Sequence, residues 1–107
     1  MAYDDVKREV EEILEKVISE MLEKEGKSWE GGILFDETPS MELGDFATTV
    51  AFQLAKGFRK APRMIAQEIA SNLEGKLPEY ISKVEVAGAG YINFFLDYEK
   101  FGRLITE

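Results

Sequence analysis

The chain has 107 residues, 45% of them hydrophobic and 32% charged, with 21 acidic against 13 basic side chains. That length supplies one hydrophobic core and is too short for two, so residues 1–107 are expected to form a single domain. The sequence contains neither cysteine nor histidine, which excludes disulfides, thiolate and imidazole metal sites, cysteine nucleophiles and Ser-His-Asp triads. We therefore expect the chain by itself not to be an enzyme and to bind no metal ion.

Neither a membrane span nor a secretory leader is predicted. No apolar run approaches the ~20 residues that cross a bilayer. The N-terminus turns acidic at Asp4, where a signal peptide needs a basic start and an apolar middle. Together with the absence of cysteine, these features favour a cytoplasmic protein, and nothing in the sequence demands more than a monomer.

The negative charge is concentrated in the first part of the chain. Residues 1–45 carry 14 acidic and 5 basic side chains, whereas residues 46–107 carry 7 acidic and 8 basic ones. A net-acidic domain is a poor general binder of nucleic acid, because such binding requires Lys and Arg to neutralise phosphates. DNA is therefore not expected as a partner, and any role with RNA must be local to the second half.

An amphipathic helix is predicted near the N-terminus, where apolar residues recur at helical spacing from Val6 to Leu22. Asp4 and Asp5 offer carboxylates to the positive end of this helix, and Gly26 is a suitable stop. The opposite face carries Glu and Lys. A solvated face over a domain core is favoured there over a surface for a partner helix.

The middle of the chain is predicted to form a short strand and two helices. The apolar run 33–35 follows a glycine pair and is broken by Thr38-Pro39-Ser40, which indicates a strand. Gly44 makes a turn and Asp45 is expected to be the N-cap of a helix over 46–57. Pro62 at the first position starts the next helix, which Gly75 ends.

A hairpin and a last helix complete the predicted elements. Val84 and Val86 alternate with charged residues, Gly88-Ala89-Gly90 forms a tight turn, and residues 91–96 form the second strand. Asp97 caps a helix whose apolar positions are Tyr98, Phe101, Leu104 and Ile105. The predicted class is α+β, a two-layer α/β sandwich with helices on one face of a small, mostly antiparallel sheet.

The second hairpin strand carries the first candidate site. Alternation places Ile92, Phe94 and Leu96 on one face, so Tyr91 and Asn93 are expected to point outward, about 6–7 Å apart. An aromatic ring stacks on an unpaired base while an amide hydrogen-bonds the edge of that base. The alternative is that the ring packs against a further layer and the amide satisfies a turn.

Four basic residues form the second candidate site, at the junction of the two middle helices. They can grip a phosphate backbone beside the positive end of the second helix, although a solvated surface turn explains them equally well. The acidic pairs, including Asp36 and Glu37, are expected to be solvated rather than to act in acid–base catalysis. The four basic residues are Lys56, Arg59, Lys60 and Arg63.

Two stretches of the sequence resemble the N-terminal additional domain of arginyl-tRNA synthetase. One consists of residues 33–39 followed by Gly44-Asp45-Phe46-Ala47-Thr48-Thr49-Val50-Ala51 and Leu54-Ala55-Lys56. The other is Val84-Glu85-Val86-Ala87-Gly88-Ala89-Gly90-Tyr91-Ile92-Asn93-Phe94. Both occur in order and at the right separation, and the resemblance covers roughly residues 30–100.

The resemblance implies a core of helix, two strands, helix and two strands, with an additional strand within residues 36–43. In that family the domain leans on the outer corner of the tRNA and reads a D-loop base, the one at the twentieth position. The matching base-reading positions here are Tyr91 and Asn93. For the remaining motif residues we expect structural roles, namely Gly44 as a turn, Asp45 as a helix cap, Phe46 as a core ring, and Gly88 and Gly90 in the hairpin turn.

The resemblance also implies partners, which are tRNA(Arg) and the catalytic domain of the synthetase. ATP would be bound only by that catalytic domain, since the present chain has no class I catalytic signature. The present chain is therefore expected to be either an excised domain of a synthetase or a free-standing relative. Ala89 stands where proline is common in the family and Thr49 where asparagine is common. The alternative function is an acidic protein-interaction module that docks on a larger partner without binding RNA.

Overall fold

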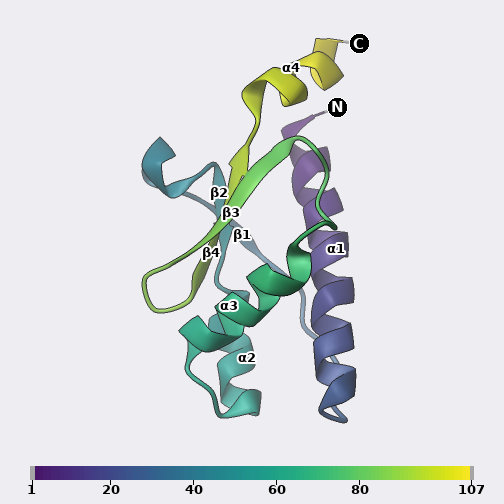
Figure 1. The fold of residues 1–107 in the computed structure, drawn as a ribbon, viewed down its shortest axis with the longest axis vertical. Helices are drawn as coiled ribbons and strands as arrows, with labels where there is room; N and C mark the ends of the chain where they lie inside the picture. The colour runs from purple at the N-terminus through teal and green to yellow at the C-terminus, as the bar shows by residue number, and fades with distance from the viewer. Residues whose placement is uncertain (1, 107) are drawn as a thin grey trace.

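The computed structural model describes residues 2–106, with side chains up to residue 104 (Figure 1). Three α-helices precede the hairpin and a fourth follows it. The fourth helix projects from the end of the sheet near the N-terminus (Figure 1). In chain order the elements are α1 (Tyr3–Lys24), β1 (Phe35–Glu37), the 3-10 turn η1 (Met41–Leu43), β2 (Phe46–Thr48), α2 (Val50–Phe58), α3 (Pro62–Leu73), β3 (Ile81–Ala87), β4 (Tyr91–Leu96) and α4 (Tyr98–Thr106).

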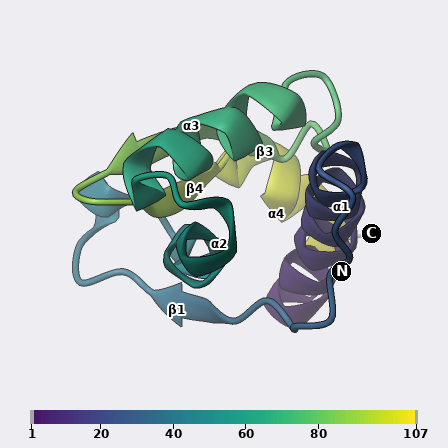
Figure 2. The same cartoon turned by 90° about the horizontal axis from the view of Figure 1, so that it is seen from below.

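The sheet has four antiparallel strands in the order β1-β2-β4-β3. Figure 2 shows α2 enclosed between α1, α3 and β1, and the buried apolar faces of α1, α2 and α3 form one core with the inner face of the sheet. The predicted α+β class with a small antiparallel sheet is confirmed. Within residues 2–106, no helix is long and apolar enough to cross a membrane.

The centre of the core is a cluster of aromatic rings. Phe46 of β2 lies opposite Phe94 of β4, and their fully buried rings stack with centroids 5.2 Å apart. Phe35 of β1 meets both rings edge-on, at 5.2 and 6.0 Å, and Tyr3 of α1 meets Phe46 at 6.0 Å. These contacts join three strands to the first helix, in an arrangement that aromatic pairs favour beyond their burial.

The prediction of a helix over 46–57 was wrong at its start. Phe46 to Thr48 form the strand β2, and the helix begins at Val50, whose backbone N–H donates to the Thr48 hydroxyl at 3.2 Å. The additional strand implied within 36–43 was also misplaced, because that segment holds η1 and β2 comes later. β1 itself begins two residues later than predicted. Three-residue strands carry too little periodicity to mark their own bounds.

Asp45 joins the two ends of the fold instead of capping a helix. Its side chain accepts hydrogen bonds from the backbone N–H of Leu96, at 2.8 Å, and from the Tyr98 hydroxyl. Its carbonyl oxygen accepts a hydrogen bond from the Tyr3 hydroxyl at 2.9 Å. The expected cap role was therefore wrong, and this residue connects the start of β2 to α1, to the end of β4 and to α4.

The other predicted elements are confirmed. Gly26, with a φ of +71°, follows the end of α1, and Pro62 is the first residue of α3. The Asp97 side chain accepts a hydrogen bond from the backbone N–H of Lys100 at 3.1 Å and so caps α4. The side chain of Ile105, which was expected on the apolar face of this helix, lies outside the described residues.

Glycine is required at position 44. Its φ is +94°, and a Cβ there would lie 2.7 Å from the Phe94 carbonyl oxygen, inside van der Waals contact. Gly44→Ala should therefore lower the free energy of unfolding by about 2 kcal/mol, measured by chemical denaturation. Gly57→Ala is the control, because a Cβ there meets nothing within 4 Å and alanine favours a helix by about 0.5–1 kcal/mol. Equal losses in both variants would contradict this account.

A buried phenol, Tyr80, and a half-buried one, Tyr3, make stability depend on alkaline pH. Burial and the charges of Asp45, Glu37 and Asp4 raise the pKa of Tyr3 to about 12. Burial and the hydrogen bond to Glu9 raise the pKa of Tyr80. Each raised pKa stabilises the fold below the unfolded value of about 10, and this contribution disappears as the pH rises through the folded pKa.

The free energy of unfolding should therefore fall between pH 10 and pH 12 more steeply in the wild type than in a Tyr3→Phe, Tyr80→Phe double variant. Chemical denaturation at a series of pH values measures both slopes. Parallel slopes would contradict the assignment of this pH dependence to the two phenols.

Candidate nucleic-acid interface

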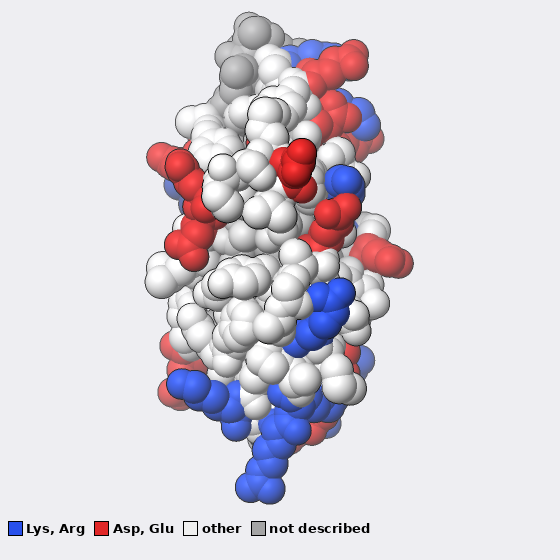
Figure 3. Space-filling view, turned by 90° about the vertical axis from the view of Figure 1, so that its left-hand side faces the viewer, with Lys and Arg blue, Asp and Glu red and all other residues white. Residues whose placement is uncertain are grey.

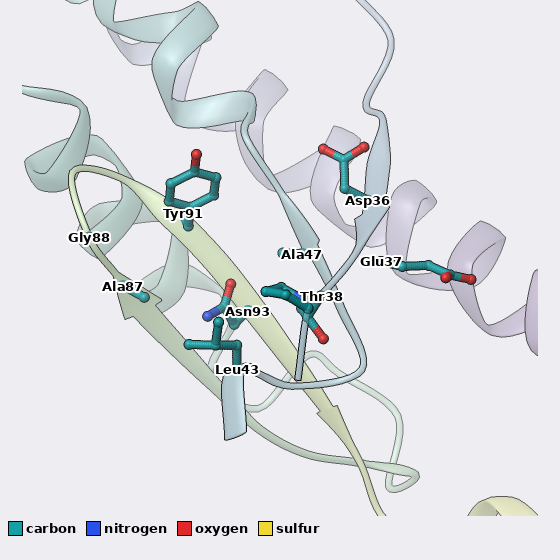
Figure 4. A pocket seen from close by; sticks show the side chains of 10 residues that line it. Asp36, Glu37, Thr38, Leu43, Ala47, Ala87, Gly88, Tyr91 and Asn93 are labelled. Carbon is teal, nitrogen blue, oxygen red and sulfur yellow. The ribbon is translucent and has the colours of Figure 1, made fainter. Parts of the chain in front are cut away.

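A pocket of about 360 Å³ opens on the face of β4 that points away from the core (Figure 4). It lies between the hairpin turn and the segment that connects β1 to β2, so two parts of the chain that are far apart in sequence form its walls. Its lining residues are Asp36, Glu37, Thr38, Pro39, Leu43, Ala47, Ala87, Gly88, Tyr91 and Asn93. Both predicted base-reading residues are among them.

The Tyr91 ring forms one wall and is 47% exposed. It packs edge-on against Phe52 of α2, with ring centroids 5.3 Å apart. It also covers Gly88 in the hairpin turn, where a Cβ would lie 3.4 Å from the ring. The ring is thus supported from two elements while it keeps exposed area for a ligand.

Asn93 points outward from the core as predicted, but it is buried. Only 4% of it is exposed, whereas the sequence reasoning expected an open position. Leu43 and Thr38, from the β1–β2 connection, lie over this part of the sheet and cover it (Figure 4). Among the described residues, none donates to or accepts from the Asn93 amide. The amide is therefore available to a ligand that enters the pocket.

Small residues make room for the pocket. Ala47 of β2 is the register partner of Asn93, and Ala87 of β3 is the register partner of Tyr91. Side chains directly across a sheet lie about 5 Å apart, so larger residues at either position would fill the space beside the ring and the amide.

The β1–β2 connection is held down by its own hydrogen bonds. The Thr38 hydroxyl lies within hydrogen-bond distance of the Ser40 carbonyl, at 3.1 Å, and of the Gly44 carbonyl. The backbone N–H of Asp45 donates to the Phe94 carbonyl at 2.8 Å. Sequence reasoning missed this cover. The only sequence signal for it was a threonine six residues before a glycine that needs a positive φ.

The hairpin turn is docked on the start of α3. Gly90 has a φ of +154°, and a Cβ there would lie 2.8 Å from the Pro62 Cβ. The Arg63 side chain donates to the Gly88 carbonyl at 2.5 Å. The turn that carries Tyr91 is therefore fixed by the helix that follows the basic junction.

The four predicted basic residues take different positions around this junction. Arg63 is occupied by the turn, and Lys60 forms an ion pair with Glu68 at 3.1 Å. Lys56 and Arg59 lie exposed at the end of α2, and neither forms an ion pair with another described residue.

Figure 3 shows basic side chains gathered at the lower end of this face, where Figure 1 places the α2–α3 junction. Most acidic side chains lie higher, beside a broad uncharged area. Lys27, which the sequence reasoning did not select, joins the same corner. Its ammonium group donates to the Gly57 carbonyl at 2.5 Å and lies 5.1 Å from the centre of the Phe58 ring.

Residues 6–96 match the family model described as arginyl tRNA synthetase N terminal domain. The chain belongs to this family. The arginine–tRNA ligase of Thermococcus sibiricus is 80% identical over all of this chain, which covers 17% of that ligase. The ligase of Thermococcus kodakarensis is 51% identical over 99% of the chain and 16% of its own length. The chain thus spans less than a fifth of these curated relatives.

Solved structures agree with the family. The Thermus thermophilus arginyl-tRNA synthetase matches 94% of this chain and 15% of its own, with a TM-score of 0.73 and 31% identity. The Plasmodium falciparum enzyme has the same TM-score over 90% of this chain at 13% identity, and so shares the fold. The resemblance predicted from two short motifs is confirmed over nearly the whole chain.

The geometry assigns Arg63 of this arginyl-tRNA synthetase N-terminal domain a positioning role at the turn. Arg63→Ala should speed amide hydrogen exchange in the hairpin turn about fivefold, which corresponds to one lost hydrogen bond of about 1 kcal/mol. Lys60→Ala is the control, since its ion pair joins the α2–α3 junction to Glu68 of α3 and does not involve the hairpin. Unchanged exchange at Gly90 in the Arg63 variant would contradict this role.

Proposed function

We propose that the chain is a tRNA-binding accessory module that takes the D-loop base at the twentieth position of tRNA(Arg) into the pocket. The module thereby positions the tRNA for arginylation by a catalytic domain outside this chain. The observation that carries the proposal is the convergence of an exposed aromatic ring and an unpartnered amide on one pocket, at Tyr91 and Asn93.

The pocket suits a flipped-out base on physical grounds. A base that stacks on an aromatic side chain gains about 1–3 kcal/mol. The Asn93 amide both donates and accepts, so it can pair with the edge of a base. Because Asn93 is only 4% exposed, a hydrogen bond made by its side-chain amide has less competition from solvent than one on an open sheet.

Phosphate contacts would come from the basic corner at the α2–α3 junction. Within this corner, Lys56 and Arg59 form no ion pair with another described residue, and Lys60 and Lys27 lie beside them. The formal net charge of the whole chain is −8, so these contacts are few and the affinity of the module alone should be modest. Its contribution to the complex is register and base identity.

The outer face of α1 does not favour the alternative of a protein-docking module. Its apolar residues pack into the core or against it, and no large apolar side chain of α1 is exposed in the part of the helix that the structure describes. The exposed large apolar residues lie elsewhere, and two of them, Leu43 and Tyr91, line the pocket.

Removal of the stacking ring should weaken tRNA binding. Tyr91→Ala should raise the dissociation constant for tRNA(Arg) about tenfold at low salt, because stacking of one base is lost. Tyr91→Phe is the matched control and should bind within about twofold of the wild type, since it keeps the ring. Fluorescence anisotropy with labelled tRNA measures both. Equal affinity of the alanine variant and the wild type would contradict the proposal.

The basic corner should contribute without regard to the base. A Lys56→Ala, Arg59→Ala double variant should weaken binding equally for tRNA(Arg) transcripts with any base at the D-loop position. It should also reduce the slope of log affinity against log salt by about 1–2. The control is a Lys16→Ala, Lys76→Ala variant, which removes the same charge from a separate hollow. An unchanged salt slope in the first variant, or an equal reduction in both, would contradict this assignment.

A further inference from the structure

A carboxylate stands across the pocket from the Asn93 amide. Asp36 of β1 is the register partner of Ala47, and Ala47 is the register partner of Asn93. The three residues therefore form one row across three strands, with their side chains on the same face of the sheet. Asp36 lines the pocket, and Ala47 leaves the space between the two polar groups open (Figure 4).

The spacing of this row fits one base. Neighbouring strands lie about 4.8 Å apart, so the backbones of Asp36 and Asn93, two strands apart, are separated by roughly 9.6 Å. A pyrimidine-sized ring with a hydrogen bond of about 2.9 Å on each of two edges spans a gap of this order. A base stacked against Tyr91 can thus meet the amide on one edge and the carboxylate on the other.

Asp36 is the carboxylate that remains available in this region. It forms no ion pair or hydrogen bond with another residue that the structure describes. Glu85, in the same row beyond Asn93, is paired with Lys83 at 3.0 Å. Glu37 also lines the pocket, but its register partner is the core residue Phe46, so its side chain leaves β1 on the opposite face of the sheet from Asp36. The sequence analysis treated Asp36 and Glu37 alike, as solvated carboxylates, whereas the structure places them on different faces of β1.

We propose that Asp36 determines the specificity of the pocket and selects a base that carries an exocyclic amino group. This inference rests on the proposed function. An ionised carboxylate accepts hydrogen bonds and cannot donate. Adenine, cytosine and guanine offer it an amino group, whereas the carbonyl oxygens of uracil flank its single N–H donor and repel the carboxylate. Asn93, which donates and accepts, would then hold the base without choosing among bases.

The test uses four tRNA(Arg) transcripts that differ only in the D-loop base, with the 107-residue chain as wild type, Asp36→Asn and Glu42→Gln. Glu42 is exposed in η1, on the β1–β2 connection, and does not line the pocket. Each variant loses one negative charge from this part of the chain, so general effects on phosphate attraction are matched. The wild type should bind the best of the three amino-bearing bases about tenfold more tightly than uracil. In Asp36→Asn this ratio should fall to within about threefold, because asparagine can also donate to a carbonyl. In Glu42→Gln the ratio should stay at the wild-type value.

The outcomes separate this inference from the proposed function. If Asp36→Asn keeps the wild-type ratio while Tyr91→Ala weakens binding of every transcript, the selective role of Asp36 is wrong and base binding in the pocket stands. If Tyr91→Ala binds all transcripts as tightly as the wild type, or no transcript binds the wild type at low salt, the proposed function is wrong and this inference is wrong with it.

Discussion

The pairing of β2 with β4 is the constraint on which the rest of the structure depends. It places the Phe46 ring on the Phe94 ring inside the core, and because side chains alternate along a strand, it turns Ala47 and Asn93 to the opposite face together. The same pairing brings the backbone at Gly44 against the Phe94 carbonyl. One register thus fixes the core, the floor of the pocket and the point where the covering loop returns.

The chemistry of the pocket follows from its small alanine side chains and from the side-chain amide of Asn93, which has no partner among the described residues. Alanines on the neighbouring strands leave the space, the hairpin turn supports the aromatic wall, and the β1–β2 connection covers Asn93, which stays 4% exposed. Two acidic residues, Asp36 and Glu37, line the pocket, whereas basic side chains gather at the helix junction (Figure 3). A module of this kind contributes identity through one base rather than affinity through many phosphates.

Strong periodicity made most of the fold predictable from the sequence. The long stripe of α1, the proline start of α3 and the glycine turn of the hairpin each specify their element locally. The short strands β1 and β2 depend on partners distant in sequence, so their bounds and the true role of Asp45 could not be predicted. Tyr91 and Asn93 were placed on the correct face, but the burial of Asn93 depends on a loop whose path is set by tertiary contacts.

The central claim is that the pocket around Tyr91 and Asn93 receives a base of the D-loop. An NMR titration of the labelled chain with tRNA(Arg) tests this claim directly through the side-chain amide signals of Asn93 and the ring signals of Tyr91. The account predicts saturable shifts centred on these two residues, which fade when only the D-loop base is altered. Shifts confined to α1 or α4, or no shifts at low salt, would contradict it.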